Sequence, residues 1–276
     1  MQPYWDSIKR IIIESDVVLE VLDARLVELS RNEEVERLIN EIKRPVIYVV
    51  NKSDLVSKKS LAQQTDKLKQ EGEVVFVSSE NKQSTKILLS KIKQVFHKYG
   101  KRDMEKKLMA KPTPEYREAK GDIVVGVLGY PNVGKSSIIN SLSHRKKVKV
   151  SKKAGTTHGI HWIRASSEIK LIDSPGVIPL KEDDERRYGL IGAKDPERLK
   201  DSEVVADSII KMFMKDNKKA FERFYDIQIN EDEEDYDSII NQLGRKKSFL
   251  VKGNKVDENR TAVLIVKDWQ QGRLKL

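Results

Sequence analysis

The stretch Gly129-Tyr130-Pro131-Asn132-Val133-Gly134-Lys135-Ser136 fits the phosphate-loop pattern G-x-x-x-x-G-K-[ST]. It follows an apolar run at residues 123–128 and precedes a helical pattern at 137–142, which is the strand-loop-helix context that such a loop requires. We therefore expect Lys135 to reach the β and γ phosphates of a nucleotide and Ser136 to offer its hydroxyl to Mg²⁺. The expected phosphate-binding residues are Asn132, Val133, Gly134, Lys135, Ser136 and Ser137.

Length, composition and charge limit the classes of protein to which the chain can belong. The 276 residues suffice for one large and one small domain. The absence of cysteine excludes disulfides and thiolate metal sites and fits a reducing setting. No signal peptide or membrane span is visible, so we expect a soluble cytoplasmic protein. The net charge of +10 favours RNA or DNA as partner, although a composition with 35% charged residues is also typical of heat-adapted proteins.

Strand and helix patterns alternate through the first part of the chain. Apolar runs at 16–22, 46–50 and 74–77 predict strands, and helical patterns at 33–43, 58–71 and 84–99 follow them. Such alternation predicts a parallel sheet. Residues 100–121 are rich in Lys and Arg and lose apolar periodicity, so we interpret them as a linker. The sheet resumes at 123–128, 161–165 and 169–172.

Beyond about residue 185 the alternation ends. Residues 204–225 carry apolar side chains at helical spacing, including Phe224, and Asp257 is placed to cap a last helix through Trp269, with Val263 among its inward side chains. We predict an α/β fold of the P-loop NTPase type over residues 1–184, with a mostly parallel six-stranded sheet. A small all-α domain, 185–276, would follow and bind RNA.

A second motif, Asn51-Lys52-Ser53-Asp54, follows the predicted strand at 46–50 and matches N-K-x-D. The carboxylate of Asp54 can accept hydrogen bonds from the ring N–H and the exocyclic amino group of guanine, a pair that adenine lacks. We expect Lys52 to lay its stem along the base and Asn51 to tie this loop to the phosphate loop. Backbone N–H groups of Ser78 and Ser79 would reach the guanine carbonyl.

A third motif, Asp173-x-x-Gly176, ends the last predicted strand. In this pattern the Asp holds Mg²⁺ through water and the Gly N–H senses the γ-phosphate. Thr157, or alternatively Thr156, would complete the magnesium shell. The predicted metal ligands are thus Ser136, Thr157 and Asp173, and the residues expected to act in hydrolysis are Asn132, Lys135, Thr157 and Gly176.

The order of the motifs is unusual because N-K-x-D at 51–54, called here the base-reading motif, precedes the phosphate loop. Cutting the ordinary fold after D-x-x-G and joining its old ends through residues 100–121 gives this order. The chain resembles the circularly permuted GTPases of the YlqF/YawG type over nearly its whole length. The resemblance rests on D-A-R at 23–25, N-K-S-D at 51–54, G-Y-P-N-V-G-K-S at 129–136, A-G-T-T-H-G at 154–159, D-S-P-G-V at 173–177 and G-R-K-K at 244–247.

The resemblance implies a fold, an activity and partners. Relatives assist assembly of the large ribosomal subunit, so it implies GTP/GDP as ligand and binding to rRNA or pre-ribosomal particles, most simply as a monomer. Asn132 occupies the position of a potassium ligand in relatives. Val177 stands where many GTPases place a water-orienting Gln, so slow intrinsic hydrolysis is expected. Ala154 and Ser79 depart from the residues usual in the family, without removing a side-chain ligand.

Two other classes of function are compatible with parts of this pattern. A P-loop enzyme acting on a small substrate, such as a nucleotide kinase, needs a lid with phosphate-gripping arginines and has no need of a guanine reader. An RNA-binding module with a structural nucleotide site would bind RNA equally well with or without turnover. The first interpretation, from the motifs above, is a molecular switch that GTP controls. The basic stretches at 100–121, 144–153 and 245–247 fit RNA contact both in such a switch and in an RNA-binding module.

Overall fold

The structure is a computed structural model that describes residues 2–78, 81–99, 123–143, 161–173 and 184–276. Several sequence predictions fall outside these residues. They are the linker at 100–121, the basic stretch at 144–153, and the proposed site residues Ser79, Thr157 and Gly176.

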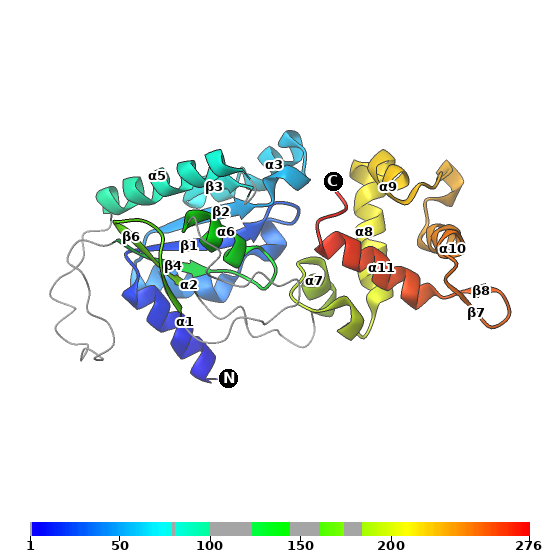
Figure 1. Cartoon of the computed structure of the whole chain (residues 1–276), viewed down its shortest axis with the longest axis horizontal. Helices are drawn as coiled ribbons and strands as arrows, with labels where there is room; N and C mark the ends of the chain where they lie inside the picture. The colour runs from blue at the N-terminus through cyan, green and yellow to red at the C-terminus, as the bar shows by residue number, and fades with distance from the viewer. Residues whose placement is uncertain (1, 79–80, 100–122, 144–160, 174–183) are drawn as a thin grey trace.

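A six-stranded sheet forms the centre of the first part of the chain (Figure 1). Its order is β3-β2-β1-β4-β6-β5, and every neighbouring pair is parallel except β5 with β6. The prediction of a mostly parallel six-stranded sheet is confirmed. The strands are β1 (Val17–Asp23), β2 (Val46–Asn51), β3 (Glu73–Val77), β4 (Ile123–Leu128), β5 (His161–Arg164) and β6 (Ile169–Asp173).

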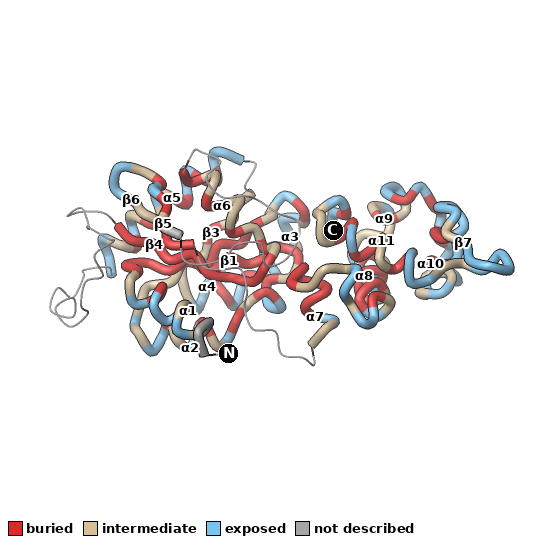
Figure 2. Tube along the Cα trace, turned by 60° about the horizontal axis from the view of Figure 1, so that its bottom comes forward, coloured by how far each residue is buried: buried red, intermediate tan, exposed pale blue. Residues whose placement is uncertain are grey.

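Helices cover both faces of this sheet. In β1 the side chains of Val17, Leu19 and Val21 pack with α5 (Lys82–Tyr99) and α6 (Lys135–Leu142), whereas Val18 packs with α1 (Gln2–Glu14) and α2 (Glu33–Ile42). Because both faces are covered, all seven residues of β1 are buried. Figure 2 shows the strands as a buried layer for the same reason.

The predicted helix at 58–71 is divided into α3 (Lys58–Thr65) and α4 (Leu68–Glu71). Thr65 lies at the end of α3 and is fully buried. Its hydroxyl donates to the carbonyl of Leu61 at 2.8 Å, and such back-bonding competes with the helical ladder and bends the helix. The side chain of Leu68 then reaches the cluster formed with Leu22 and Val50.

The C-terminal unit, defined here as residues 184–276, is mainly helical. It contains α7 (Glu185–Leu190), α8 (Ser202–Asp216), α9 (Lys218–Tyr225), α10 (Tyr236–Lys246) and α11 (Glu258–Gln270). The all-α prediction is wrong in one detail, because β7 (Leu250–Val251) and β8 (Lys255–Val256) form a short hairpin. Positive φ angles at Gly253 and Asn254 make the tight turn.

The helix predicted at 204–225 is also two helices. The N–H of Asn217 still donates to the carbonyl of Phe213, but its backbone leaves the helical conformation, with φ −160° and ψ 59°, and this ends α8. The change of direction lets Phe213 and Phe221 pack with their rings 5.5 Å apart. It also turns Phe224 outward, 41% exposed, where the helical pattern had predicted an inward side chain.

The core of the C-terminal unit surrounds Trp269, which is fully buried. Asp257 caps α11 through a hydrogen bond from the N–H of Arg260, as the sequence predicts. On α11 the fully buried positions include Ile265, whereas Val263 is half-buried. None of the helices in the described part of the chain combines the length and apolar character needed to cross a bilayer. The division of the chain at residues 184/185 stays a prediction.

Candidate nucleotide-binding site

The phosphate-loop motif connects the end of β4 to the start of α6, as predicted. Two glycines permit the close approach of neighbouring chain segments. A Cβ at Gly134, where φ is +103°, would lie 2.1 Å from Nδ2 of Asn51. A Cβ at Gly129, where φ is +142°, would lie 2.6 Å from the carbonyl oxygen of Val21. Both positions therefore require the absence of a side chain.

Lys135 is buried at the first position of α6 and points back over the loop. Its Nζ donates to the carbonyl oxygens of Gly129 at 2.8 Å and Tyr130 at 2.7 Å. Burial lowers the pKa of Lys135 to about 8, and the carboxylate of Asp173 acts in the opposite direction. The loop thus holds a poorly solvated cation, and contact with anionic phosphate oxygens would stabilise its charged form.

Asn51 joins the base-reading motif to the phosphate loop, as predicted. It is the last residue of β2, and its Nδ2 donates to the carbonyl of Val133 at 2.8 Å. Its Oδ1 is buried and accepts no hydrogen bond within the described part of the chain. The contact brings N-K-S-D and the phosphate loop to the same edge of the sheet.

The residues after Asn51 present the other groups of the motif. Lys52 adopts the left-handed conformation, φ 60°, and precedes the short 3-10 helix Ser53–Leu55. Nζ of Lys52 donates to Oδ2 of Asp23 at 2.8 Å. Asp54, in contrast, is exposed, so its carboxylate is accessible to a base. The Lys52 side chain is thus held on Asp23, while that of Asp54 faces solvent.

Ser78 follows β3 at the same edge. Its backbone N–H donates to Oγ of Ser84 at 3.3 Å, while Ser84 Oγ–H donates to the carbonyl of Ser78 at 2.9 Å. A bond from the Ser78 amide to a guanine carbonyl would therefore replace the bond to Ser84.

Asp173 is the last residue of β6 and pairs in register with Val127 of β4, the strand that leads into the phosphate loop. Its side chain is 1% exposed, and Ser136 lies in the first turn of α6. A carboxylate and a hydroxyl are the hard oxygen donors that Mg²⁺ prefers, so these residues fit the ion. No group of three or more His, Asp or Glu side chains suited to a metal occurs among the described residues.

Several functional contacts were not predicted from the sequence. Nδ2 of Asn132 donates to the carbonyl of Gly192 in the C-terminal unit at 2.6 Å. The hydroxyl of Tyr130 accepts a hydrogen bond from Nδ2 of Asn32 at 3.1 Å, and the ring of Tyr130 lies 6.3 Å from that of Tyr188. The phosphate loop therefore packs directly against the C-terminal unit. No local sequence pattern predicts these contacts, because Gly192 lies 60 positions from Asn132 and Asn32 lies 98 positions from Tyr130.

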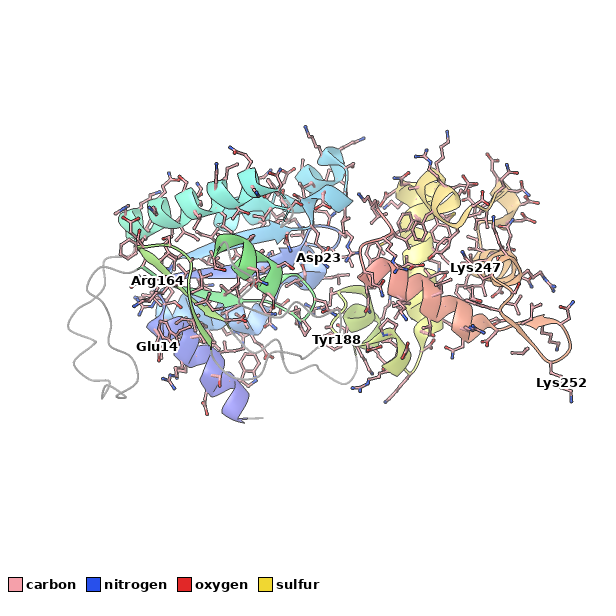
Figure 3. All side chains as sticks on the ribbon, in the orientation of Figure 1. Glu14, Asp23, Arg164, Tyr188, Lys247 and Lys252 are labelled. Carbon is pink, nitrogen blue, oxygen red and sulfur yellow. The ribbon has the colours of Figure 1, made fainter. Side chains whose placement is uncertain are left out.

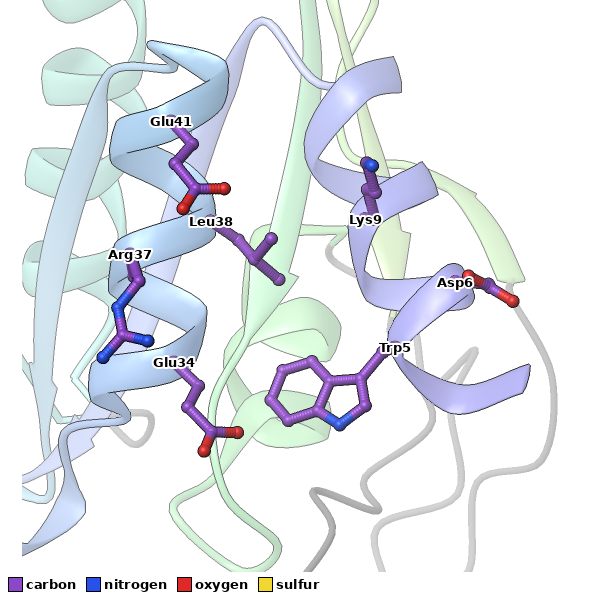
Figure 4. A pocket seen from close by; sticks show the side chains of 7 residues that line it. All are labelled: Trp5, Asp6, Lys9, Glu34, Arg37, Leu38 and Glu41. Atoms are coloured by element: carbon purple, nitrogen blue, oxygen red, sulfur yellow. The ribbon is translucent and has the colours of Figure 1, made fainter. Parts of the chain in front are cut away.

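A pocket between α1 and α2 is not part of this site (Figure 4). Opposite charges line it, with Lys9 and Arg37 against Asp6, Glu34 and Glu41. The helices α1 and α2 cover one face of the sheet, whereas α6, which follows the phosphate loop, covers the other.

Comparison with known proteins shows what the chain is similar to. Residues 124–255 match the model of the 50S ribosome-binding GTPase family. A GTP-binding protein of Methanocaldococcus jannaschii is 35% identical over 272 residues, which are 99% of this chain and 66% of that protein. Ribosome biogenesis GTPase A of Priestia megaterium is 28% identical over 92% of this chain and 84% of its own.

The fold has a solved counterpart. A crystal structure of GNP-bound YlqF from T. maritima covers 99% of this chain and 95% of its own, with a TM-score of 0.61 and 22% identity. At this identity the likeness shows the shared fold. The chain spans 66% of the Methanocaldococcus protein and about half the length of several eukaryotic relatives that it matches.

Proposed function

The chain belongs to the 50S ribosome-binding GTPase family, and from that premise we propose that it binds and hydrolyses GTP as a switch in assembly of the large ribosomal subunit. The observation that carries the proposal is the bond from Asn51 to the carbonyl of Val133, because it joins a guanine reader to a phosphate loop. One ligand that spans both loops must combine a guanine base with phosphates.

In this proposal the residues divide into a base half and a phosphate half. Asp54 accepts hydrogen bonds from guanine, Lys52 lies along the base, and the amides at Ser78 and Ser79 face its carbonyl. Backbone N–H groups of residues 132–137 surround the phosphates. Lys135 exchanges its two carbonyl partners for phosphate oxygens, which are stronger acceptors for a buried cation.

Magnesium would be held by Ser136 and Thr157 directly and by Asp173 through water. When bound, Mg²⁺ neutralises charge on the β and γ phosphates. Lys135 adds a second positive charge on the same oxygens, and Gly176 contributes an N–H toward the γ-phosphate. Asn132 would be a ligand of a potassium ion, which would supply further positive charge to the phosphates; its Nδ2 donates to the carbonyl of Gly192.

Hydrolysis by the isolated protein should be slow, because Val177 cannot orient a water molecule. Ribosomal particles and potassium would then act as activators. Ordering of the segments around Thr157 and Gly176 by GTP would reach the C-terminal unit, because Gly176 leads into it within a few residues.

The C-terminal unit offers a basic surface to RNA. No acidic residue occurs between positions 238 and 256, whereas Arg245, Lys246, Lys247, Lys252 and Lys255 do. Lys246 pairs with Asp226, which leaves the other four cations on the exposed end of α10 and the hairpin. Figure 3 places Lys252 at the far end of the hairpin, away from the sheet. We propose that residues 185–276 act as the domain that contacts rRNA.

Co-sedimentation with large-subunit particles tests this function. We propose that the protein acts in the cytoplasm as a monomer. In potassium buffer it should bind the particles in the presence of a non-hydrolysable GTP analogue, and the bound fraction should be at least tenfold lower with GDP or an ATP analogue. Equal binding in all three states would contradict the switch and would favour an RNA-binding module with a structural nucleotide site. Lys58→Ala, an exposed lysine on α3, serves as a control for general loss of charge.

A further inference from the structure

Asp23 fixes the position of the lysine in the base-reading motif. It ends β1, is 1% exposed, and uses both carboxylate oxygens. Oδ2 accepts from Nζ of Lys52 and from Nη2 of Arg25, each at 2.8 Å, and Oδ1 accepts from Nε of Arg25 at 3.0 Å. Burial alone would raise the pKa of Asp23, but Arg25 and Lys52 outweigh it and hold the pKa well below its ordinary value.

Arg25 carries the contact onward to the C-terminal unit. Its guanidinium carbon lies 4.1 Å from the centroid of the Trp269 ring, and Nη1 donates to the carbonyl of Trp269. Arg25 is 3% exposed and Trp269 is fully buried. One planar cation thus binds a carboxylate with its edge and stacks on an indole with its face, a combination that lysine cannot make.

Trp269 is in turn fixed to the rest of the C-terminal unit. Its Nε1 donates to the carbonyl of Leu190 at 2.7 Å, and Nε2 of Gln270 donates to the carbonyl of Gly189 at 2.8 Å. Gly189 and Leu190 end α7, and the turn that follows contains Gly192, whose carbonyl accepts from Asn132 of the phosphate loop. The turn and α11 therefore touch the base side and the phosphate side of the nucleotide site together.

We propose that Asp23 and Arg25 are positioning residues that couple occupancy of the guanine site to the packing of α11. The coupling rests on the proposed contact of Lys52 with the base. A base lying along the Lys52 stem restrains its Nζ on Asp23, which holds Arg25 against Trp269. Because coupling is reciprocal, docking of α11 strengthens guanine binding by the factor by which guanine strengthens docking.

Amide hydrogen exchange at residues 269–273 tests the coupling in the full chain. This segment ends α11, with the N–H of Gly272 bound to the carbonyl of Trp269 and the N–H of Arg273 to that of Asp268. Saturating GDP should slow exchange there about fivefold or more in the wild type, the lower range of allosteric coupling. In Lys52→Met at saturating GDP the slowing should fall below about twofold. Equal slowing in both proteins would overturn the coupling.

A matched control is Lys58→Met, which removes an exposed lysine six positions away and should leave the slowing unchanged. The proposed guanine site is tested by the same proteins. If the wild type fails to bind GDP, or Lys52→Met binds it as tightly as the wild type, the proposed contact itself is wrong and the coupling falls with it. If Lys52→Met weakens GDP binding yet keeps the full slowing, the coupling alone is wrong.

A double-mutant cycle on GDP affinity provides an independent readout. Trp269→Phe should weaken GDP binding about fivefold in the wild type. In Lys52→Met it should leave GDP affinity unchanged, because the contact of Lys52 with Asp23 is already absent. A purely structural role of Trp269 predicts the same factor in both backgrounds and would overturn the proposal. If Trp269→Phe does not fold, Arg25→Lys takes its place, since it keeps the charge and loses the stacking face.

Discussion

Nδ2 of Asn51 donates to the carbonyl of Val133 at 2.8 Å, across 82 positions of sequence. The bond connects the loop after β2 to the loop after β4, two strands that β1 separates in the sheet. Gly134 permits the approach, because any side chain there would occupy the space of the Asn51 amide. The bond therefore fixes the loop after β2 against the phosphate loop, and with it the two halves of the proposed nucleotide site.

Asn51→Ala tests the value of this bond. The substitution leaves the buried Val133 carbonyl without its donor, so the free energy of unfolding should fall by about 1–3 kcal/mol. GDP affinity should fall as well, because the two loops lose their connection. Urea unfolding and calorimetric titration measure the two effects. Asn40→Ala, at an exposed position of α2, should change neither, and an unchanged GDP affinity in Asn51→Ala would contradict the role of the bond.

Alanine substitutions at two glycines with positive φ, Gly253 and Gly134, measure the cost of backbone strain separately from the cost of steric overlap. Gly253→Ala in the hairpin adds a Cβ that meets nothing within 4 Å, so only strain remains and stability should fall by about 1 kcal/mol. Gly134→Ala adds the same strain and places the Cβ 2.1 Å from Nδ2 of Asn51. It should cost about 1–3 kcal/mol beyond the Gly253 variant and abolish GDP binding. Equal stability of the two variants in thermal unfolding would argue against close packing at Gly134.

The pH dependence of nucleotide affinity should follow the protonation state of Lys135. Its pKa of about 8 in the free protein means that it is protonated at pH 7 and mostly neutral at pH 9.5. Bound phosphates raise this pKa, so binding above pH 8 requires uptake of a proton, and GDP affinity should fall on the order of 10-fold to 30-fold between the two pH values. Lys135→Met should bind GDP weakly at both. A wild-type affinity that is constant with pH would contradict the shifted pKa.

The carboxylate of Asp23 should stabilise the fold in a pH-dependent manner. Its folded pKa lies below the unfolded value of about 3.9, so the stabilisation is present above that value and is lost as pH falls toward the folded pKa. Asp23→Asn leaves Arg25 and Lys52 without their carboxylate and should cost about 3–5 kcal/mol at pH 7.

Chemical unfolding of both proteins from pH 7 to pH 3 measures this effect. The difference between wild type and Asp23→Asn should shrink as pH falls below about 4. Asp66→Asn, at an exposed position after α3, should stay within about 1 kcal/mol of the wild type. A difference between Asp23→Asn and wild type that is the same at pH 7 and pH 3 would contradict the stabilising ion pair.

The sheet and the two loops were predictable because each motif follows a buried strand. Strands covered on both faces appear as continuous apolar runs, and parallel strands bring their carboxyl ends to one edge. The positions of Asn51 and Lys135 at that edge follow from these two rules. The positions of Ser136 and Asp173, the proposed Mg²⁺ donors, follow in the same way.

Contacts between distant segments were not predictable. Arg25 and Trp269 are 244 positions apart, and no local pattern says that α11 packs against the end of β1. The break at Asn217 brings Phe213 against Phe221, a tertiary contact that local helix propensity does not predict. The strands of the hairpin, two residues each, are too short to give a periodic signal.

The most direct test of the guanine site is the nucleotide preference of Asp54→Asn. Xanthine carries a carbonyl where guanine carries its exocyclic amino group, so an amide at position 54 can donate where the carboxylate could only accept. Calorimetric titration of wild type and variant with GDP, ADP and xanthosine diphosphate measures the change. We predict that the wild type prefers GDP by at least about 100-fold and that Asp54→Asn prefers xanthosine diphosphate. Equal affinity of the wild type for GDP and ADP would contradict the account.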